Sequence, residues 1–83
     1  MDVSIERETA KELITFKLQH IQDLIRSILN KWNQDNSDDF ISKAKSGELE
    51  NAEMDAITMR QLMADHSKLR ELLERVTSGE QND

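Results

Sequence analysis

The sequence contains no cysteine and no proline, and only two of its 83 residues are glycine. Without cysteine, neither a disulfide nor a thiolate-bound metal can stabilise the fold. The absence of proline and the scarcity of glycine argue against a sheet protein with many turns and remove the strongest helix breakers. Together with a charged fraction of 34%, these absences favour an all-α protein built from long helices.

Long apolar runs and basic clusters are also lacking. No apolar run approaches the ~20 residues that cross a bilayer, and the stretch MDVSIERETAKE has no apolar segment of a secretory signal. We therefore expect a cytoplasmic protein without membrane contact. Because no Lys/Arg cluster with interleaved aromatic residues is present, we expect no nucleic-acid partner. The net charge of −6 is concentrated in residues 35–55, where seven acids stand against two lysines, so any partner of this segment should be a basic protein.

Helical periodicity is the strongest positive signal. In the N-terminal half, large apolar side chains alternate at steps of four and three residues, which is an a/d heptad seam. Its members are Ile14, Leu18, Ile21, Ile25, Ile28 and Trp32. A second seam with steps of three and four consists of Met59, Leu62, His66, Leu69, Leu73 and Val76. The two seams predict two long helices that pack along their length.

Local signals indicate where the helices end. The run NQDNSDD holds side chains that compete for backbone hydrogen bonds, and Ser37 within it is a plausible N-cap for a short helix whose left-handed stop is Gly47. Phe40 and its apolar neighbours on that helix should cover the end of the hairpin where the connecting segment joins the two long helices. Gly79 should end the last helix, within a single domain over residues 1–79. The expected elements are a first helix over about residues 5–32, a short helix over about 38–46, a third helix over about 48–77 and a disordered tail over 80–83.

An isolated hairpin of these helices would leave apolar side chains uncovered, because leucines flank both seams. We therefore predict an antiparallel hairpin of two long helices with a short connecting helix, completing a four-helix bundle as a homodimer. The alternative is a monomeric three-helix arrangement in which the connector folds back over the hairpin. Phe16 points away from the seam, and aromatic anchors dominate interface hot spots. The candidate interface residues are Leu13, Phe16, Leu24, Leu62, His66, Leu69, Leu72 and Leu73.

His66 interrupts the apolar seam of the third helix. The residue three positions before it is Met63, so the Glu-x-x-His pattern of carboxylate-bridged metal bundles is missing, and we expect no metal and no cofactor. Pairing Trp32 with Leu49 would bring His66 close to Thr15. We therefore expect a seam imidazole that bonds a neighbour such as Thr15, or that lies near the dimer axis and fixes register.

Two short patterns resemble those of enzyme families. Arg60 and His66 resemble the Arg-x(4 to 6)-His pattern of the HEPN ribonucleases, which would imply RNA cleavage at a dimer interface with His66 as general acid or base. Two Glu-x-x-Glu pairs are similar to the metal-binding pattern of MazG-type nucleotide pyrophosphohydrolases. The pairs are Glu50 with Glu53 and Glu71 with Glu74. With no helix breaker between them, however, they should lie about 30 Å apart on one helix at ~1.5 Å per residue, too far for one metal.

The favoured function is a non-enzymatic one, a helical protein–protein interaction or assembly module such as an adaptor or regulatory subunit. The alternative is a small dimeric helical enzyme, or a nucleotide- or RNA-processing domain, that uses Arg60 and His66 or the glutamate pairs. The expected partners are a second copy of the chain and, at residues 35–55, a basic protein.

Overall fold

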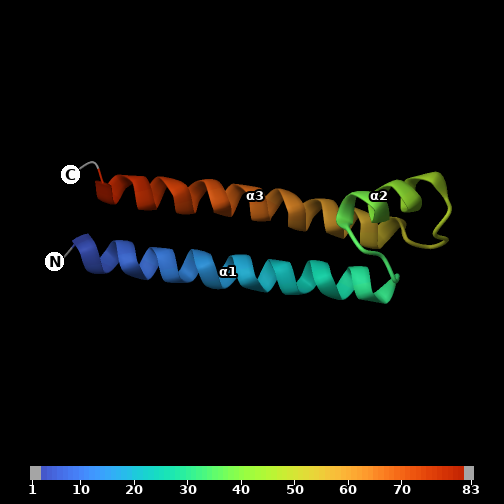
Figure 1. Cartoon of the computed structure of the whole chain (residues 1–83), viewed down its shortest axis with the longest axis horizontal. Helices are drawn as coiled ribbons and strands as arrows, with labels where there is room; N and C mark the ends of the chain where they lie inside the picture. Colours follow the sequence, from blue (N-terminus) through green and yellow to red (C-terminus); the bar gives the residue numbers. More distant parts are fainter. Residues whose placement is uncertain (1–2, 82–83) are drawn as a thin grey trace.

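The computed structural model describes the backbone of residues 3–81 and the side chains of residues 6–78. Within this range the chain forms three helices and no strand, which confirms the all-α prediction. The helices are α1 (Val3–Lys31), α2 (Ser37–Ser46) and α3 (Glu53–Gln81). The two long helices lie side by side and run in opposite directions, and α2 lies against α3 at one end, which we call the closed end (Figure 1). Across residues 3–81, no helical segment combines the length and apolar character needed to span a bilayer.

The N-cap of α2 is Asn36, not the predicted Ser37. Asn36 has an extended backbone, and its side-chain oxygen accepts a 2.8 Å hydrogen bond from the backbone N–H of Asp39. Asparagine caps helices as well as serine does, and here it stands one residue earlier. The predicted stop at Gly47 is confirmed, because this residue has a φ of 85° in the left-handed region that favours glycine.

The start of α3 was predicted wrongly, near Glu48 instead of Glu53. The intervening residues form turns, in which the N–H of Leu49 donates to the carbonyl of Lys43 at 3.2 Å and Asn51 adopts a φ of 62°. Leu49 and Ala52 pack on the core cluster. These apolar residues therefore close the end of the core, and tertiary packing overrides the continuous helical pattern of the sequence.

The predicted helix stop at Gly79 is also wrong, because α3 continues to Gln81. Glycine costs about 1 kcal/mol inside a helix and permits a left-handed stop without imposing one. The residues after Gly79 are all polar, so a turn at Gly79 would bury no apolar side chain. Residues 80 and 81, predicted to be part of a disordered tail, are therefore helical, and residues 82 and 83 lie outside the described part of the chain.

The core lies at the closed end, beneath α2. Phe40 and Ala44 of α2 are buried together with Ala52 and Met59. The ring of Phe40 packs at a tilt of 36° on that of Trp32, with 6.2 Å between centroids. The prediction that the apolar face of the short helix plugs this end is thus confirmed.

Away from the closed end, the two predicted seams provide the contact between α1 and α3. Ile14 and Ile21 of α1 are buried, and the other seam residues of both helices are buried or half-buried. Toward the opposite end, which we call the open end, no third helix of residues 3–81 covers α1 and α3 (Figure 1). Burial there depends on two helices alone, which explains why most seam side chains in this half are only half-buried.

One carboxylate oxygen fixes the register between the long helices. Oδ2 of Asp55 accepts a 2.9 Å hydrogen bond from Nζ of Lys31 and a 2.8 Å hydrogen bond from Nε1 of Trp32. The Lys31 ammonium also lies 5.5 Å from the centroid of the Trp32 ring. Trp32 was predicted to pair with Leu49, so the observed register is displaced by about one heptad. A slip of one heptad keeps both seams face to face, which is why periodicity did not reveal it.

These contacts lower the pKa of Asp55. The hydrogen bond from Lys31 has the largest effect and the hydrogen bond from Trp32 follows, while partial burial of the carboxyl acts in the opposite direction. Because the pKa in the folded state lies below its value in the unfolded chain, the carboxylate contributes stability above the unfolded pKa of about 4. That contribution is lost as the pH falls through the folded pKa.

The substitution Asp55→Asn should therefore destabilise the protein at neutral pH. We expect a loss of about 1 kcal/mol, because the amide oxygen of asparagine can still accept hydrogen bonds but lacks the negative charge that strengthens them, and a fall in Tm of about 4–8 °C. Asparagine does not titrate, so the difference in Tm between the two proteins should shrink between pH 7 and about pH 3. Thermal unfolding followed by circular dichroism at one protein concentration measures this.

Glu12→Gln provides the control, because Glu12 is exposed and forms no ion pair or hydrogen bond within the described part of the chain. Its Tm at pH 7 should stay within the change that about 0.5 kcal/mol produces. Equal Tm values for Asp55→Asn and the unsubstituted protein at pH 7 would contradict the assigned role of Asp55.

Candidate functional site

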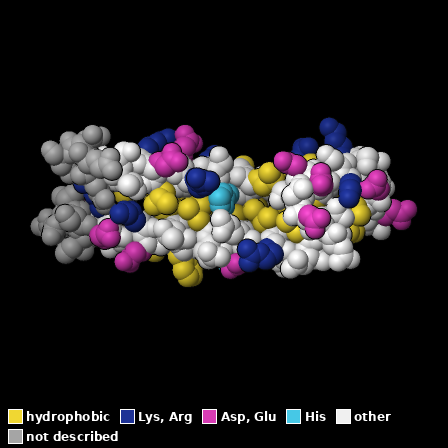
Figure 2. Space-filling view, viewed as in Figure 1, with side chains coloured by type: hydrophobic (Ala, Val, Ile, Leu, Met, Phe, Trp, Pro, Cys, Tyr) yellow, Lys and Arg dark blue, Asp and Glu magenta, His cyan; other side chains and the backbone are white. Residues whose placement is uncertain are grey.

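A groove of about 770 Å³ runs between α1 and α3, directly beside α2. Its floor is apolar and consists of Ile25, Leu29 and Met63, which also pack against the core cluster. Figure 2 shows this face, where hydrophobic side chains lie on either side of a histidine along the line between the long helices. The polar rim includes Gln22, Arg26 and His66, while Gln34 and Asp35 close the groove near α2.

His66 occupies the seam position that the sequence predicts, but its partner differs. Its Nε2 lies 3.2 Å from Nε2 of Gln22, and its side chain is half-buried. Because an amide nitrogen only donates, this contact is a hydrogen bond when His66 carries its proton on Nδ1. The predicted partner Thr15 is wrong by one heptad along α1, for the same reason that Trp32 meets Asp55.

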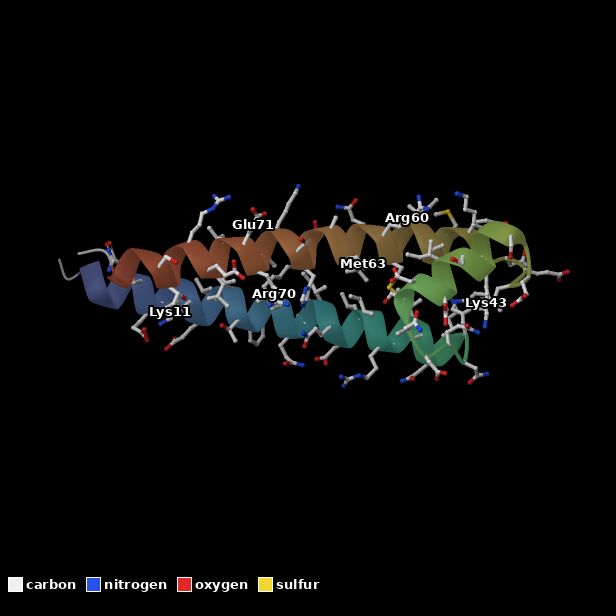
Figure 3. All side chains as sticks on the ribbon, turned by 45° about the horizontal axis from the view of Figure 1, so that its top comes forward. Lys11, Lys43, Arg60, Met63, Arg70 and Glu71 are labelled. Carbon is white, nitrogen blue, oxygen red and sulfur yellow. The ribbon has the colours of Figure 1, made fainter. Side chains whose placement is uncertain are left out.

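Arg60 and His66 line different cavities. Arg60 borders a second pocket, of about 310 Å³, between α2 and α3, together with Lys45 and Ile57. At ~100° per residue, Arg60 and His66 project about 120° apart around α3. Figure 3 shows Arg60 on the outer edge of α3, whereas Met63 and Arg70 lie on the side toward α1. Within one chain, the two residues that resemble the HEPN pattern therefore do not converge on one site.

The glutamate pairs do not converge either. Glu50 lies in the turn before α3 and Glu53 is the first residue of the helix, so the prediction that both pairs lie on one continuous helix is wrong for Glu50. The chain turns at Asn51 because Ala52 packs into the core. All four glutamates are exposed. In the described part of the chain, no group of three or more His, Cys, Asp or Glu side chains is arranged to hold a metal ion.

The acidic residues at 35–55 find some partners within the chain. Asp55 is paired with Lys31, and a carboxylate oxygen of Glu48 lies 4.0 Å from Nζ of Lys43. Asp38 and Asp39 stand in the first turn of α2, where the helix dipole favours negative charge. A basic protein partner at this end stays a prediction.

The face of the long helices opposite the groove carries exposed leucines. At ~100° per residue, Leu13 and Leu24 lie about a quarter turn to one side of the α1 seam, and Gln22 and Arg26 lie on the other side. Leu72 has the same relation to the α3 seam, away from the groove. The exposed fractions of Leu13, Leu24 and Leu72 are 66%, 40% and 42%. Phe16, 76% exposed, lies at the outer edge of this surface, and we call these four residues the apolar face.

The eight interface candidates thus divide into two groups. Leu62, His66, Leu69 and Leu73 are half-buried on the side of α3 that packs on α1 of the same chain. The remaining four form the apolar face, which no described helix covers. Sequence reasoning missed Arg26, which lines the groove, and Arg70, which lies one turn beyond His66 on the side of α3 toward α1. Their signal was weak, because a single arginine next to a heptad seam usually belongs to the solvated side of a helix.

No family model, no curated protein and no solved structure matches the chain.

Replacing His66 by leucine should stabilise the protein. A leucine would complete the apolar seam, and Gln22 is exposed and can return to water, so no buried polar group is left unpaired. We expect a gain of about 1 kcal/mol and a rise in Tm of about 4–8 °C, measured by thermal unfolding.

Ser67→Leu is the matched control, because serine and histidine have similar helix propensities and Ser67 is exposed. Its effect on unfolding should stay within about 0.5 kcal/mol. A lower Tm for His66→Leu would show that the contact with Gln22 contributes more than the added apolar burial.

Proposed function

We propose that this chain is a non-enzymatic helical interaction module that associates with a second copy of itself through the apolar face. Association would complete a four-helix bundle from the two pairs of long helices. The observation that carries the proposal is the set of uncovered side chains at Leu13, Phe16, Leu24 and Leu72. They line one face of α1 and α3, and exposed apolar patches of this kind mark association sites.

The shape of the molecule favours a second copy as the occupant. It measures 54 × 18 × 18 Å, so the two long helices form a single layer. Helical domains are normally built from two layers packed against each other. Because α2 packs on the groove side, it does not obstruct the apolar face. A twofold dimer would cover the same leucines on both copies with one contact.

Charge favours an antiparallel orientation of the two copies. Residues 35–55 carry a net charge of −5, from seven acids and two lysines, and lie mostly at the closed end. A parallel dimer would bring both closed ends together, whereas an antiparallel dimer places each against the less charged open end of its partner. Repulsion between like charges is thereby reduced.

The output of such a dimer would be the display of its outer surfaces, as in an adaptor or a regulatory subunit. The enzymatic alternative based on Arg60 and His66 has less support, because these residues line different cavities. The glutamate pairs are exposed and separate, which gives the pyrophosphohydrolase alternative no more support.

The double substitution Leu13→Glu/Leu72→Glu should abolish self-association. Sedimentation equilibrium at micromolar concentration should give about twice 9.6 kDa for the unsubstituted chain and 9.6 kDa for the variant. Each chain would bring two glutamates into the interface, where their negative charges repel one another and lose their hydration. The dissociation constant of the dimer should therefore rise at least about a hundredfold.

Ile57→Glu is the control, since Ile57 is 62% exposed but lies beside the second pocket and outside the apolar face. This variant should remain dimeric, and circular dichroism should show that all variants keep their helices. A 9.6 kDa species for the unsubstituted chain would contradict the dimer.

A further inference from the structure

The groove beside α2 carries unpaired positive charge. Arg26 stands on its α1 rim. Arg70 follows His66 by one turn of α3 and lies on the side toward α1 (Figure 3). Among the described residues, neither arginine forms an ion pair or a side-chain hydrogen bond. Arg26 lines the groove, and Arg70 lies one turn of α3 beyond its last lining residue on that helix, His66. In a chain with a net charge of −6, the two arginines form a local cationic rim with His66 between them.

The floor of the groove is an apolar surface that already accommodates a helix. Ile25, Leu29 and Met63 contribute to the packing around Phe40 of α2, and the same three residues continue as the floor beyond α2. The groove extends along α1 from Gln22 to Asn30, which is about 12 Å at ~1.5 Å per residue. This length matches about two turns of a second helix placed beyond α2.

We propose that the groove binds an acidic amphipathic helix of another protein. Its apolar side chains would pack on Ile25, Leu29 and Met63, as those of α2 do, and its carboxylates would face Arg26 and Arg70. Bidentate pairing with a carboxylate is the geometry that arginine favours. Asp35 lies at the end near α2, so the acidic residues of the partner should lie toward the open end.

A helix fits this surface better than a nucleic acid does. No aromatic side chain lines the groove, so bases would find no stacking platform. The charge of −6 opposes a phosphate backbone, whereas a short acidic helix would interact mainly with the cationic rim. The groove lies on the face opposite the apolar face, and this inference therefore does not depend on self-association.

The test uses two synthetic, fluorescein-labelled peptides of about 14 residues, long enough for about four helical turns. Both have leucines at heptad a/d spacing, and one has glutamates where the other has lysines. Fluorescence anisotropy with the full chain should give micromolar affinity for the acidic peptide and at least tenfold weaker affinity for the basic one, roughly a 1.4 kcal/mol difference. Binding of the acidic peptide should weaken between about 50 mM and about 300 mM salt.

The variant Arg26→Glu/Arg70→Glu should weaken binding of the acidic peptide at least about tenfold. Arg60→Glu, which reverses an exposed arginine outside the groove, should leave it unchanged. Circular dichroism should show that both variants keep the helical content of the unsubstituted chain.

Several outcomes would overturn the proposal. These are equal affinity for the two peptides, no binding of the acidic peptide at about 100 µM, equal weakening by Arg60→Glu, or tighter binding of a labelled single-stranded DNA than of the peptide. The Leu13→Glu/Leu72→Glu variant should bind the acidic peptide like the unsubstituted chain. Loss of binding in that variant would place the peptide on the apolar face and refute binding in the groove. If the unsubstituted chain proves to be a monomer, the dimer is refuted, but binding of the peptide in the groove is still expected.

Discussion

The Asp55 carboxylate determines which residues of the two long helices meet. Its hydrogen bonds to Lys31 and Trp32 join the last turn of α1 to the first turn of α3. Apolar seams with a heptad repeat tolerate displacement by a whole heptad, so van der Waals packing alone would leave the register poorly determined. This polar contact at the closed end therefore determines that His66 lies beside Gln22. It also determines which residues form the polar rim of the groove.

The second constraint is the short helix α2, which makes the two faces of the molecule different. Phe40 and Ala44 cover the long helices on one face and only near the closed end. The uncovered remainder of that face is the groove, with an apolar floor and a cationic rim. The other face is covered by none of the three described helices and presents leucines. One ten-residue helix thus separates a surface suited to a charged, amphipathic partner from a surface suited to a second copy.

Much of the fold could be predicted from the sequence, and the errors have a common cause. Seam burial, the Gly47 stop and the role of Phe40 follow from local patterns, because periodicity and capping are properties of adjacent residues. The start of α3 and the partner of His66 depend on how Leu49 and Ala52 pack in three dimensions, which the heptad pattern leaves undetermined. Among the site residues, the exposed leucines were predicted because they flank the seams. Arg26 and Arg70 were missed, since only the observed register shows that Arg26 lines the groove and that Arg70 lies one turn beyond it.

The two proposed contacts have a joint consequence. In a twofold dimer that buries the apolar face, the groove of each copy points outward on opposite sides of the four-helix bundle. Each dimer would then present two equivalent cationic grooves. A partner with two acidic helices, or a partner that is itself dimeric, could occupy both grooves at once and would bind more tightly than a single helix, because the second contact is intramolecular. The antiparallel arrangement would also direct the grooves of the two copies toward opposite ends, so that the spacing between paired acidic helices becomes a condition for tight binding. Self-association would in this way determine which acidic partners are selected, although the apolar face contacts none of them.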